Sequence, residues 1–394
     1  MHSKQIITAA LLAVSAINAQ SGSFFDVVKS QQELSLFAAL VQSLNSTFAD
    51  LIESFAPADY KTVLVPNNEA ITSFMQKNDI KSPADVPVDA ILPFLSYHIL
   101  LNNVSSTELA QPGGNIVETK LQNTEFSLLK DNAGQVVYGH KADEMAEVSK
   151  TNSLQVKSGF GDTVGIVKTD VVFNQGLLHI VDGFLTLPRN CSKTIAHRGA
   201  ERLVTYIGRV GLLDALDGTP GATCFAPSDA AIEAAGPVLM NMTDAEILDA
   251  IKFHILLDPY YTKSLKDGQV IETALTGKSV TVNIVGSDYY FNGVRAKTTN
   301  DIVRNGVAYV LDGIMPLEFN GTISGSTSTS APATSTMPST SMSTDAMTTT
   351  TGSGMTSTGT TSAPTTTGTP NAAGAIQVGG SMFVAGLMAL AALV

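Results

Sequence analysis

A short pattern occurs twice in this chain and constrains its fold more than any other feature. The first copy is TVLVPNNEAI at residues 62–71, and the second is ATCFAPSDAAI at residues 222–232. Each begins with a β-branched or apolar run, which is typical of a buried strand, and Pro then ends the strand. The polar residues that follow can cap a helix: Asn67 or Asn68 in the first copy and Ser228 in the second. Each copy therefore predicts a strand followed directly by a helix.

Two more patterns follow each copy in the same order, which indicates an internal duplication. They are SYHIL (96–100) and LLHIVDGFLTLP (177–188) after the first copy, and KFHIL (252–256) and VAYVLDGIMPLE (307–318) after the second. We therefore expect two copies of one domain, a first repeat at 21–188 and a second repeat at 192–319. The first repeat is longer, and we place its insertion between residues 138 and 165 as an extended hairpin or loop.

These patterns resemble the fasciclin-like domain family. The first box of that family has the form TVFAP-(T/S)-(N/D)-x-A-F, and its closing box resembles NGVIHVIDGVLLP. Pro66 and Pro227 fall on the first box, while Asn305-Gly306-Val307 falls on the closing box. In both repeats the helical patterns precede the strand patterns, so the expected class is α+β. The resemblance implies that each repeat is a compact β-sandwich or wedge with helices packed at one side.

The family also has a Tyr-His pair between these boxes, which is Tyr97-His98 in the first repeat and Phe253-His254 in the second. The resemblance implies that this region supports the fold and that, in animal relatives, it contributes to recognition of adhesion receptors. Phe253 departs from the pair, which weakens the transfer of this recognition role to the second repeat. From the residues alone, each His is expected in an apolar strand as a buried, hydrogen-bonded core residue.

Composition limits the partners and the compartment. The formal net charge is −12, and no Lys or Arg follows Arg304. The chain therefore lacks the basic character expected of a nucleic-acid-binding protein. The sequence contains two cysteines, Cys191 and Cys224. In the oxidising secretory pathway a Cys191–Cys224 disulfide is expected to tie the start of the second repeat to its first strand, and the alternative is two buried free thiols.

Both ends of the chain suggest export to the cell surface. Residues 1–19 have a weakly basic start, an apolar run and a small residue at the end, as in a secretory signal peptide. More than half of residues 322–370 are Ser or Thr, which predicts a disordered, O-glycosylated stalk. Residues 371–394 combine three compact residues, a spacer and an apolar end, the pattern of a lipid-anchor signal with Asn371 as the attachment site. The alternative is a simple membrane-spanning tail.

Five N-x-S/T sequons favour N-glycosylation of an exported chain. They are Asn45, Asn103, Asn190, Asn241 and Asn320.

The sequence predicts no catalytic, cofactor or metal site. It contains no HExxH motif, phosphate loop or G-x-S-x-G elbow. We therefore expect a cell-surface protein that acts in adhesion or in matrix and cell-wall organisation. Its expected partners are extracellular proteins, glycans or another copy of this chain, with the outer leaflet of the membrane holding its lipid anchor.

Two other function classes stay open. A wall-remodelling hydrolase would use carboxylates such as Asp182 and Asp312, which recur in the closing boxes before Gly. A small-ligand carrier would instead bind its ligand in an inter-domain cleft.

Overall fold

The computed structural model describes residues 22–44, 61–142, 154–319 and 321. The predicted signal peptide, stalk, lipid-anchor signal and hydrophobic tail lie outside these residues, as do Asn45, Asn320 and Asn371. Within the described ranges, no helix combines the length and the apolar character needed to cross a bilayer.

The first repeat places its helices before most of its strands, since all five helices in the described residues precede β3. Its helices are α2 (Phe24–Ser30), α3 (Ser35–Ser43), α5 (Asn68–Lys77), α6 (Val88–Tyr97) and α7 (Ser106–Leu109). Its strands are β1 (Lys61–Pro66), β2 (Ile99–Leu100), β3 (Asn115–Glu118), β4 (Val136–Lys141), β5 (Leu154–Lys157), β6 (Thr163–Phe173) and β7 (Gly176–Val181). They form one sheet in the order β2-β1-β7-β6-β5-β4-β3. Two register shifts occur along β6, which is the middle strand of this sheet.

The second repeat follows the same plan with two smaller sheets. Its helices are α8 (Cys191–Ile195), α9 (Glu201–Arg209), α10 (Leu213–Gly218), α11 (Asp229–Ala234), α12 (Gly236–Leu239) and α13 (Asp244–Phe253). Its strands are β8 (Ala222–Pro227), β9 (Ile255–Leu256), β10 (Val270–Glu272), β11 (Ser279–Val285), β12 (Asp288–Phe291), β13 (Val294–Arg295), β14 (Asp301–Val303) and β15 (Gly306–Leu311). The sheet orders are β10-β11-β12-β13 and β14-β15-β8-β9.

The duplicated pattern forms the predicted strand–helix unit in both repeats. All six residues of β1 and of β8 are buried, and each strand ends at its Pro. Asn67 then caps α5 by accepting a 2.8 Å hydrogen bond from the Ala70 N–H, and Ser228 caps α11 in the same way. Each of these strands pairs in parallel with the last strand of its repeat, β1 with β7 and β8 with β15.

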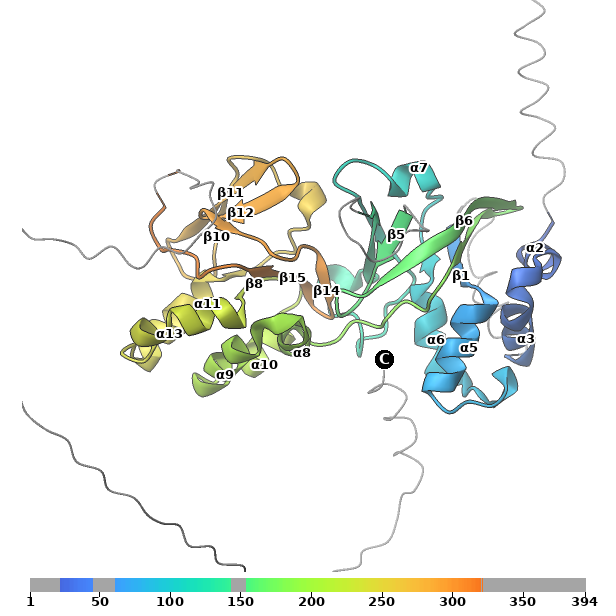
Figure 1. The fold of residues 1–394 in the computed structure, drawn as a ribbon, viewed down its shortest axis with the longest axis horizontal. Coiled ribbons are helices and arrows are strands. Elements are labelled where there is room, and N and C mark those ends of the chain that lie inside the picture. Colours follow the sequence, from blue (N-terminus) through green and yellow to red (C-terminus); the bar gives the residue numbers. More distant parts are fainter. Residues whose placement is uncertain (1–21, 45–60, 143–153, 320, 322–394) are drawn as a thin grey trace, which may run out of the picture. The chain divides into compact units, whose positions relative to one another are not determined.

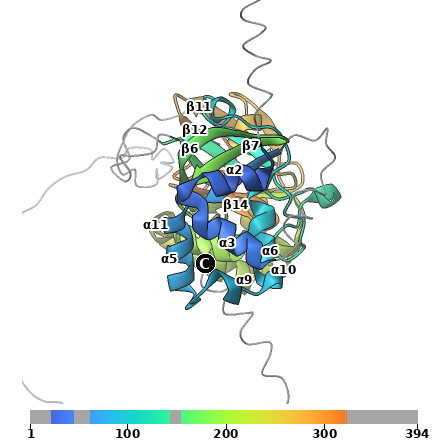
Figure 2. The ribbon, with the colours of Figure 1, turned by 90° about the vertical axis from the view of Figure 1, so that its right-hand side faces the viewer.

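In each repeat most helices gather on one side of the strands, in agreement with the α+β prediction, while the short α7 of the first repeat lies apart from them (Figure 1). In the first repeat α2, α3, α5 and α6 lie below β6 and β7 in the view of Figure 2. The spacing of apolar residues in α3 places Phe37, Leu40 and Val41 in the core, where each is at most 4% exposed. These contacts bury the apolar stripe that the helix could not leave in water.

Candidate functional site

His98 links a helix end to a distant segment of the first repeat. It is the C-terminal cap of α6 and is buried. Its Nδ1–H donates a 2.7 Å hydrogen bond to the Phe94 carbonyl, and its Nε2 accepts a 3.1 Å hydrogen bond from the Leu185 N–H. Burial lowers the pKa of His98 to about 4, since the charged ring would be poorly solvated. The neutral ring therefore ties α6 to the segment that follows β7.

His254 makes the same contacts in the second repeat. It caps α13, donates from Nδ1 to the Ala250 carbonyl at 2.8 Å and accepts at Nε2 from the Met315 N–H at 3.1 Å. Burial lowers the pKa of this ring to about 4 as well. The prediction of a buried, hydrogen-bonded His is confirmed. The predicted strand position is wrong: α6 runs to Tyr97 and α13 to Phe253, so both rings cap helices, and β2 and β9 begin only afterwards.

The residues before the two histidines lie in the core. Tyr97 is 0% exposed and donates a 2.9 Å hydrogen bond to the Val136 carbonyl, while Phe253 is 1% exposed among apolar side chains. Burial raises the pKa of the Tyr97 hydroxyl. All four residues of the predicted motif therefore make structural contacts, and none offers a surface to a partner in this structure.

The two carboxylates considered for hydrolysis hold strands in place. Asp182 Oδ1 accepts a 2.6 Å hydrogen bond from the Gly165 N–H across the β6–β7 pair. Asp312 Oδ2 lies 3.6 Å from an Arg295 guanidinium nitrogen. Among the described residues, no three His, Cys, Asp or Glu side chains are grouped so that they could hold a metal ion.

Three of the five sequons lie in the described ranges. Asn103 and Asn241 are exposed, as glycosylation requires. Asn190 is half-buried, and its Oδ1 accepts a 3.4 Å hydrogen bond from an Arg304 guanidinium nitrogen. Glycosylation at these positions stays a prediction, and Asn190 is the least accessible of the three.

The two cysteines meet in the core of the second repeat. Cys191 opens α8, Cys224 lies in β8, and both are buried free thiols in this structure. A hydrogen bond to the Cys224 side chain and burial raise the pKa of the Cys191 thiol. The two cysteines thus lie next to each other, as a disulfide would require. The disulfide itself stays a prediction.

We expect the exported protein to carry a Cys191–Cys224 disulfide, because contacting thiols oxidise readily in the secretory pathway. Alkylation of the denatured protein should modify neither residue before reduction and both residues after it, as mass spectrometry of the peptides can show. Full alkylation without a reductant would instead establish two free thiols.

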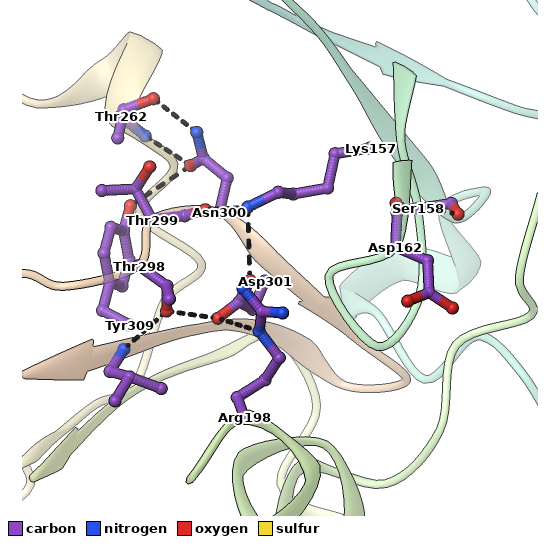
Figure 3. Close-up of polar contacts among 11 residues, drawn as sticks. Lys157, Ser158, Asp162, Arg198, Thr262, Thr298, Thr299, Asn300, Asp301 and Tyr309 are labelled. Atoms are coloured by element: carbon purple, nitrogen blue, oxygen red, sulfur yellow. Dashed lines mark hydrogen bonds and ion pairs between the residues drawn. The ribbon is translucent and has the colours of Figure 1, made fainter. Parts of the chain in front are cut away.

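A buried ion-pair network joins the two repeats around Asp301, the first residue of β14 (Figure 3). The Asp301 side chain is 0% exposed. From the first repeat, Lys157 Nζ lies 3.3 Å from Asp301 Oδ1 and donates a 2.9 Å hydrogen bond to the Thr299 carbonyl. From the second repeat, Arg198 Nε lies 3.5 Å from Oδ2, and the Thr298 hydroxyl donates to the same oxygen. The buried carboxylate is thus paired on both sides, as a buried charge must be.

The loop from Ser158 to Asp162 packs directly against this network. Gly161 has a φ of +73°, and a Cβ at this position would lie 2.5 Å from Asp301 Oδ1, so the close approach requires glycine. The neighbouring Phe160 ring meets His197 edge-on, with 4.9 Å between ring centroids. The predicted insertion of the first repeat therefore contributes part of the contact between the repeats.

Hydrogen bonds to backbone carbonyls extend the contact between the repeats. The buried Gln135 donates from Nε2 to the carbonyls of Val303 and Arg304, at 3.2 and 3.3 Å. The Arg304 carbonyl also accepts a 2.7 Å hydrogen bond from the Leu128 N–H, and Arg304 Nε donates to the Thr124 carbonyl at 3.0 Å. No sequence motif predicts this interface. Its one local signal is an acidic residue, Asp301, at the start of an otherwise apolar strand.

Comparison with known proteins places both repeats in one family. The model of the Fasciclin domain matches residues 32–188 and 198–317. A fasciclin-like arabinogalactan protein of Cercospora beticola is 26% identical over 176 residues, 44% of this chain and 46% of that protein. One from Arthroderma benhamiae is 22% identical over 64% of this chain and 58% of its own length, and one from Arabidopsis thaliana is 26% identical over 69% and 67%. The chain thus spans about half the length of the first two relatives.

A solved structure of a FAS1 domain pair from the insect cell adhesion molecule Fasciclin I aligns with 72% of this chain and 97% of its own, at 18% identity and a TM-score of 0.34. The assignment to a family rests instead on the domain model, which matches well over half of the residues in two consecutive segments that coincide with the duplicated fold. The chain belongs to the fasciclin domain family.

Proposed function

We propose that this protein is a lipid-anchored cell-surface glycoprotein whose two fasciclin domains act in cell adhesion or cell-wall organisation. The observation that carries the proposal is the family match over both repeats, because fasciclin domains are adhesion-type modules. The names of the similar proteins, fasciclin-like arabinogalactan proteins, support a place at the cell surface or in the wall.

The network around Asp301 supports the proposal that the two domains bind a partner as one unit. Lys157 of the first domain and Arg198 of the second share the buried carboxylate of Asp301, so the two domains are in direct polar contact. A partner would then meet surfaces of both domains held together. That partner is an extracellular protein, a glycan or a second copy of this chain.

The remaining parts of the proposal concern display at the surface. The two domains are 21–188 and 192–319, the signal peptide is removed, and residues 322–370 form a glycosylated stalk. A lipid attached at Asn371 then holds the protein on the outer leaflet. In this scheme the stalk supplies reach, and the domains supply recognition.

We expect the full chain to promote aggregation when it is produced on cells that do not otherwise aggregate. A phosphatidylinositol-specific phospholipase should release the protein and abolish aggregation. Val63→Asp should also abolish it, because Val63 in β1 is 1% exposed and a buried unpaired charge unfolds the first domain. Val167→Asp is the matched control, since Val167 in β6 is 45% exposed and the same change should leave aggregation intact.

Two further chains separate the domains from the stalk. Exchange of residues 322–370 for another Ser/Thr/Pro-rich sequence of equal length should preserve aggregation. Deletion of residues 21–319, with the signal peptide, stalk and anchor kept, should abolish it. Aggregation by this stalk-only chain would contradict the proposal, because recognition would then lie in the stalk glycans.

A further inference from the structure

The second domain contains an apolar pocket among its helices. The pocket has about 420 Å³ of space not filled by atoms, part of which is continuous with solvent. Because this space includes open solvent, the enclosed part is much smaller than a drug-sized ligand site and suits only a small ligand. Side chains from α9, α11 and α13 line it, together with residues after β15, and they include Leu203, Tyr206, Ile232, Ile247, Ala250 and Ile314.

The hydrogen bonds of the capping histidines identify the equivalent place in the first domain. His98 donates to the carbonyl of Phe94, and His254 donates to the carbonyl of Ala250. Both acceptors lie four residues before a histidine that caps the same helix of the fold. Phe94 and Ala250 are therefore structural counterparts, and the second domain lacks the ring that the first domain has at this position.

The hydrogen bonds of the same two histidines also identify corresponding residues after the last strand of each domain. His98 Nε2 accepts from the Leu185 N–H, and His254 Nε2 accepts from the Met315 N–H. The residues immediately before these donors, Phe184 and Ile314, are therefore counterparts as well. A second aromatic ring of the first domain is replaced by a smaller aliphatic side chain.

A third replacement lies in the helix that follows the duplicated strand. Asn67 and Ser228 are the N-caps of α5 and α11, so positions equally far from these caps correspond. Phe74 lies seven residues after Asn67, and Ala235 lies seven residues after Ser228. Here too a ring in the first domain corresponds to a methyl group in the second.

In the first domain these three rings pack against one another. The ring centroids of Phe74 and Phe94 are 5.6 Å apart, and those of Phe74 and Phe184 are 4.5 Å apart. Phe184 also meets the His98 ring edge-on at 5.5 Å. The helices of this fold thus accommodate a cluster of aromatic rings beside the capping histidine. In the second domain Ala250 and Ile314 line a pocket beside the corresponding histidine.

We infer that this pocket is a binding site for a small, uncharged aromatic molecule, whose ring lies where Phe94 and Phe184 lie in the first domain, because their counterparts Ala250 and Ile314 line the pocket. Aromatic rings pack favourably edge-to-face at the separations seen in the first domain. The His254 ring lines the pocket, as the ligand ring would require for such a contact.

The chemistry of the lining excludes a charged group inside the pocket. Of the lining side chains, those of Tyr206 and His254 carry a nitrogen or oxygen atom. Both nitrogens of His254 are already hydrogen-bonded to the backbone. A charge placed here would lose its water without gaining a partner, which is strongly unfavourable.

The rim of the pocket is suited to ligand entry. Leu239 and Met242 line the pocket, and between and beside them Met240 is 81% exposed and Val238 is 61% exposed. Methionine side chains are flexible and adapt to ligands of irregular shape. These exposed apolar side chains extend the surface available to a ligand beyond the pocket itself.

The test uses the full-length protein after enzymatic removal of N-glycans, with toluene as an uncharged single-ring probe whose binding is followed by NMR. The wild-type protein should give saturable binding. Ala250→Phe restores the ring that the first domain has at this position, and it should weaken binding by about tenfold or more through steric exclusion. Ala245→Phe is the matched control on the same helix, α13, where Ala245 is exposed and outside the pocket. It should bind the probe as the wild type does.

Ile314→Phe provides a second test if Ala250→Phe does not fold, as judged by circular dichroism and melting temperature. It restores the ring of Phe184 and should weaken binding in the same direction. Absence of saturable binding to the wild-type protein would overturn the inference. Equal affinities for the folded pocket variants and for Ala245→Phe would also overturn it, because the probe would then bind elsewhere.

Discussion

Replacement of Asp301 by asparagine is expected to lower the free energy of unfolding by about 3–5 kcal/mol. Asparagine has nearly the same shape but carries no charge, so Lys157 and Arg198 would be left facing an uncharged partner. The Lys157 side chain is 13% exposed, and water can replace the lost carboxylate only in part. Urea unfolding of the full chain should also separate into two transitions, because the contact between the domains weakens.

Asp288→Asn is the control for this experiment. Asp288 pairs with Arg295 at 2.9 Å, but the two side chains are 41% and 48% exposed, and such surface pairs contribute about 0–1 kcal/mol. If Asp301→Asn and Asp288→Asn unfold at the same urea concentration, the buried network does not hold the domains together.

Acidification should destabilise the protein between pH 6.5 and pH 4 through His98 and His254. Each has a folded-state pKa of about 4 against an ordinary value of 6.5, so the unfolded chain binds protons first. The stability that the neutral rings provide is complete above pH 6.5 and is lost as the pH falls towards 4. The expected loss is about 3 kcal/mol for each histidine. The main physical reason is that burial leaves a charged ring poorly solvated, and a protonated Nε2 would also place its N–H against the Leu185 or Met315 N–H.

The pH dependence can be assigned by substitution. His98→Gln removes one titrating group, so the fall in melting temperature between pH 6.5 and pH 4 should be clearly smaller, even though stability at neutral pH is also reduced. His197→Gln is the control, because His197 is exposed and makes neither of these hydrogen bonds. An unchanged pH dependence in His98→Gln would mean that carboxylates, rather than this histidine, determine the acid sensitivity.

Local chemistry explains why much of the fold could be predicted. The strand, the proline and the capping residue at 62–67 act within one short segment, and the structure has each where the sequence predicted it. The duplication then made the second repeat predictable from the first. The position of His98 was predicted less well, because an apolar run such as SYHIL fits a strand or the end of a buried helix equally well. The structure resolves this through a hydrogen bond to Leu185, far away in the sequence.

The network and the pocket depend on contacts between distant segments. Asp301 meets residues that lie 144 positions away in the case of Lys157, and no short motif marks such a meeting. The pocket has one signal in the sequence. Aligning the two repeats on their histidines places the buried Phe94 opposite Ala250, and the loss of a core ring predicts either a filled space or a cavity.

Parallel pairing of the first and last strands makes each domain resist tension in shear. β1 and β7 run in the same direction over six paired positions. A force that pulls the amino-terminal end of β1 away from the carboxyl-terminal end of β7 therefore slides one strand along the other. The hydrogen bonds between them carry the load together, instead of opening one after another as in a zipper. β8 and β15 repeat the arrangement, so a chain pulled from both sides of its two domains contains two such mechanical clamps in series.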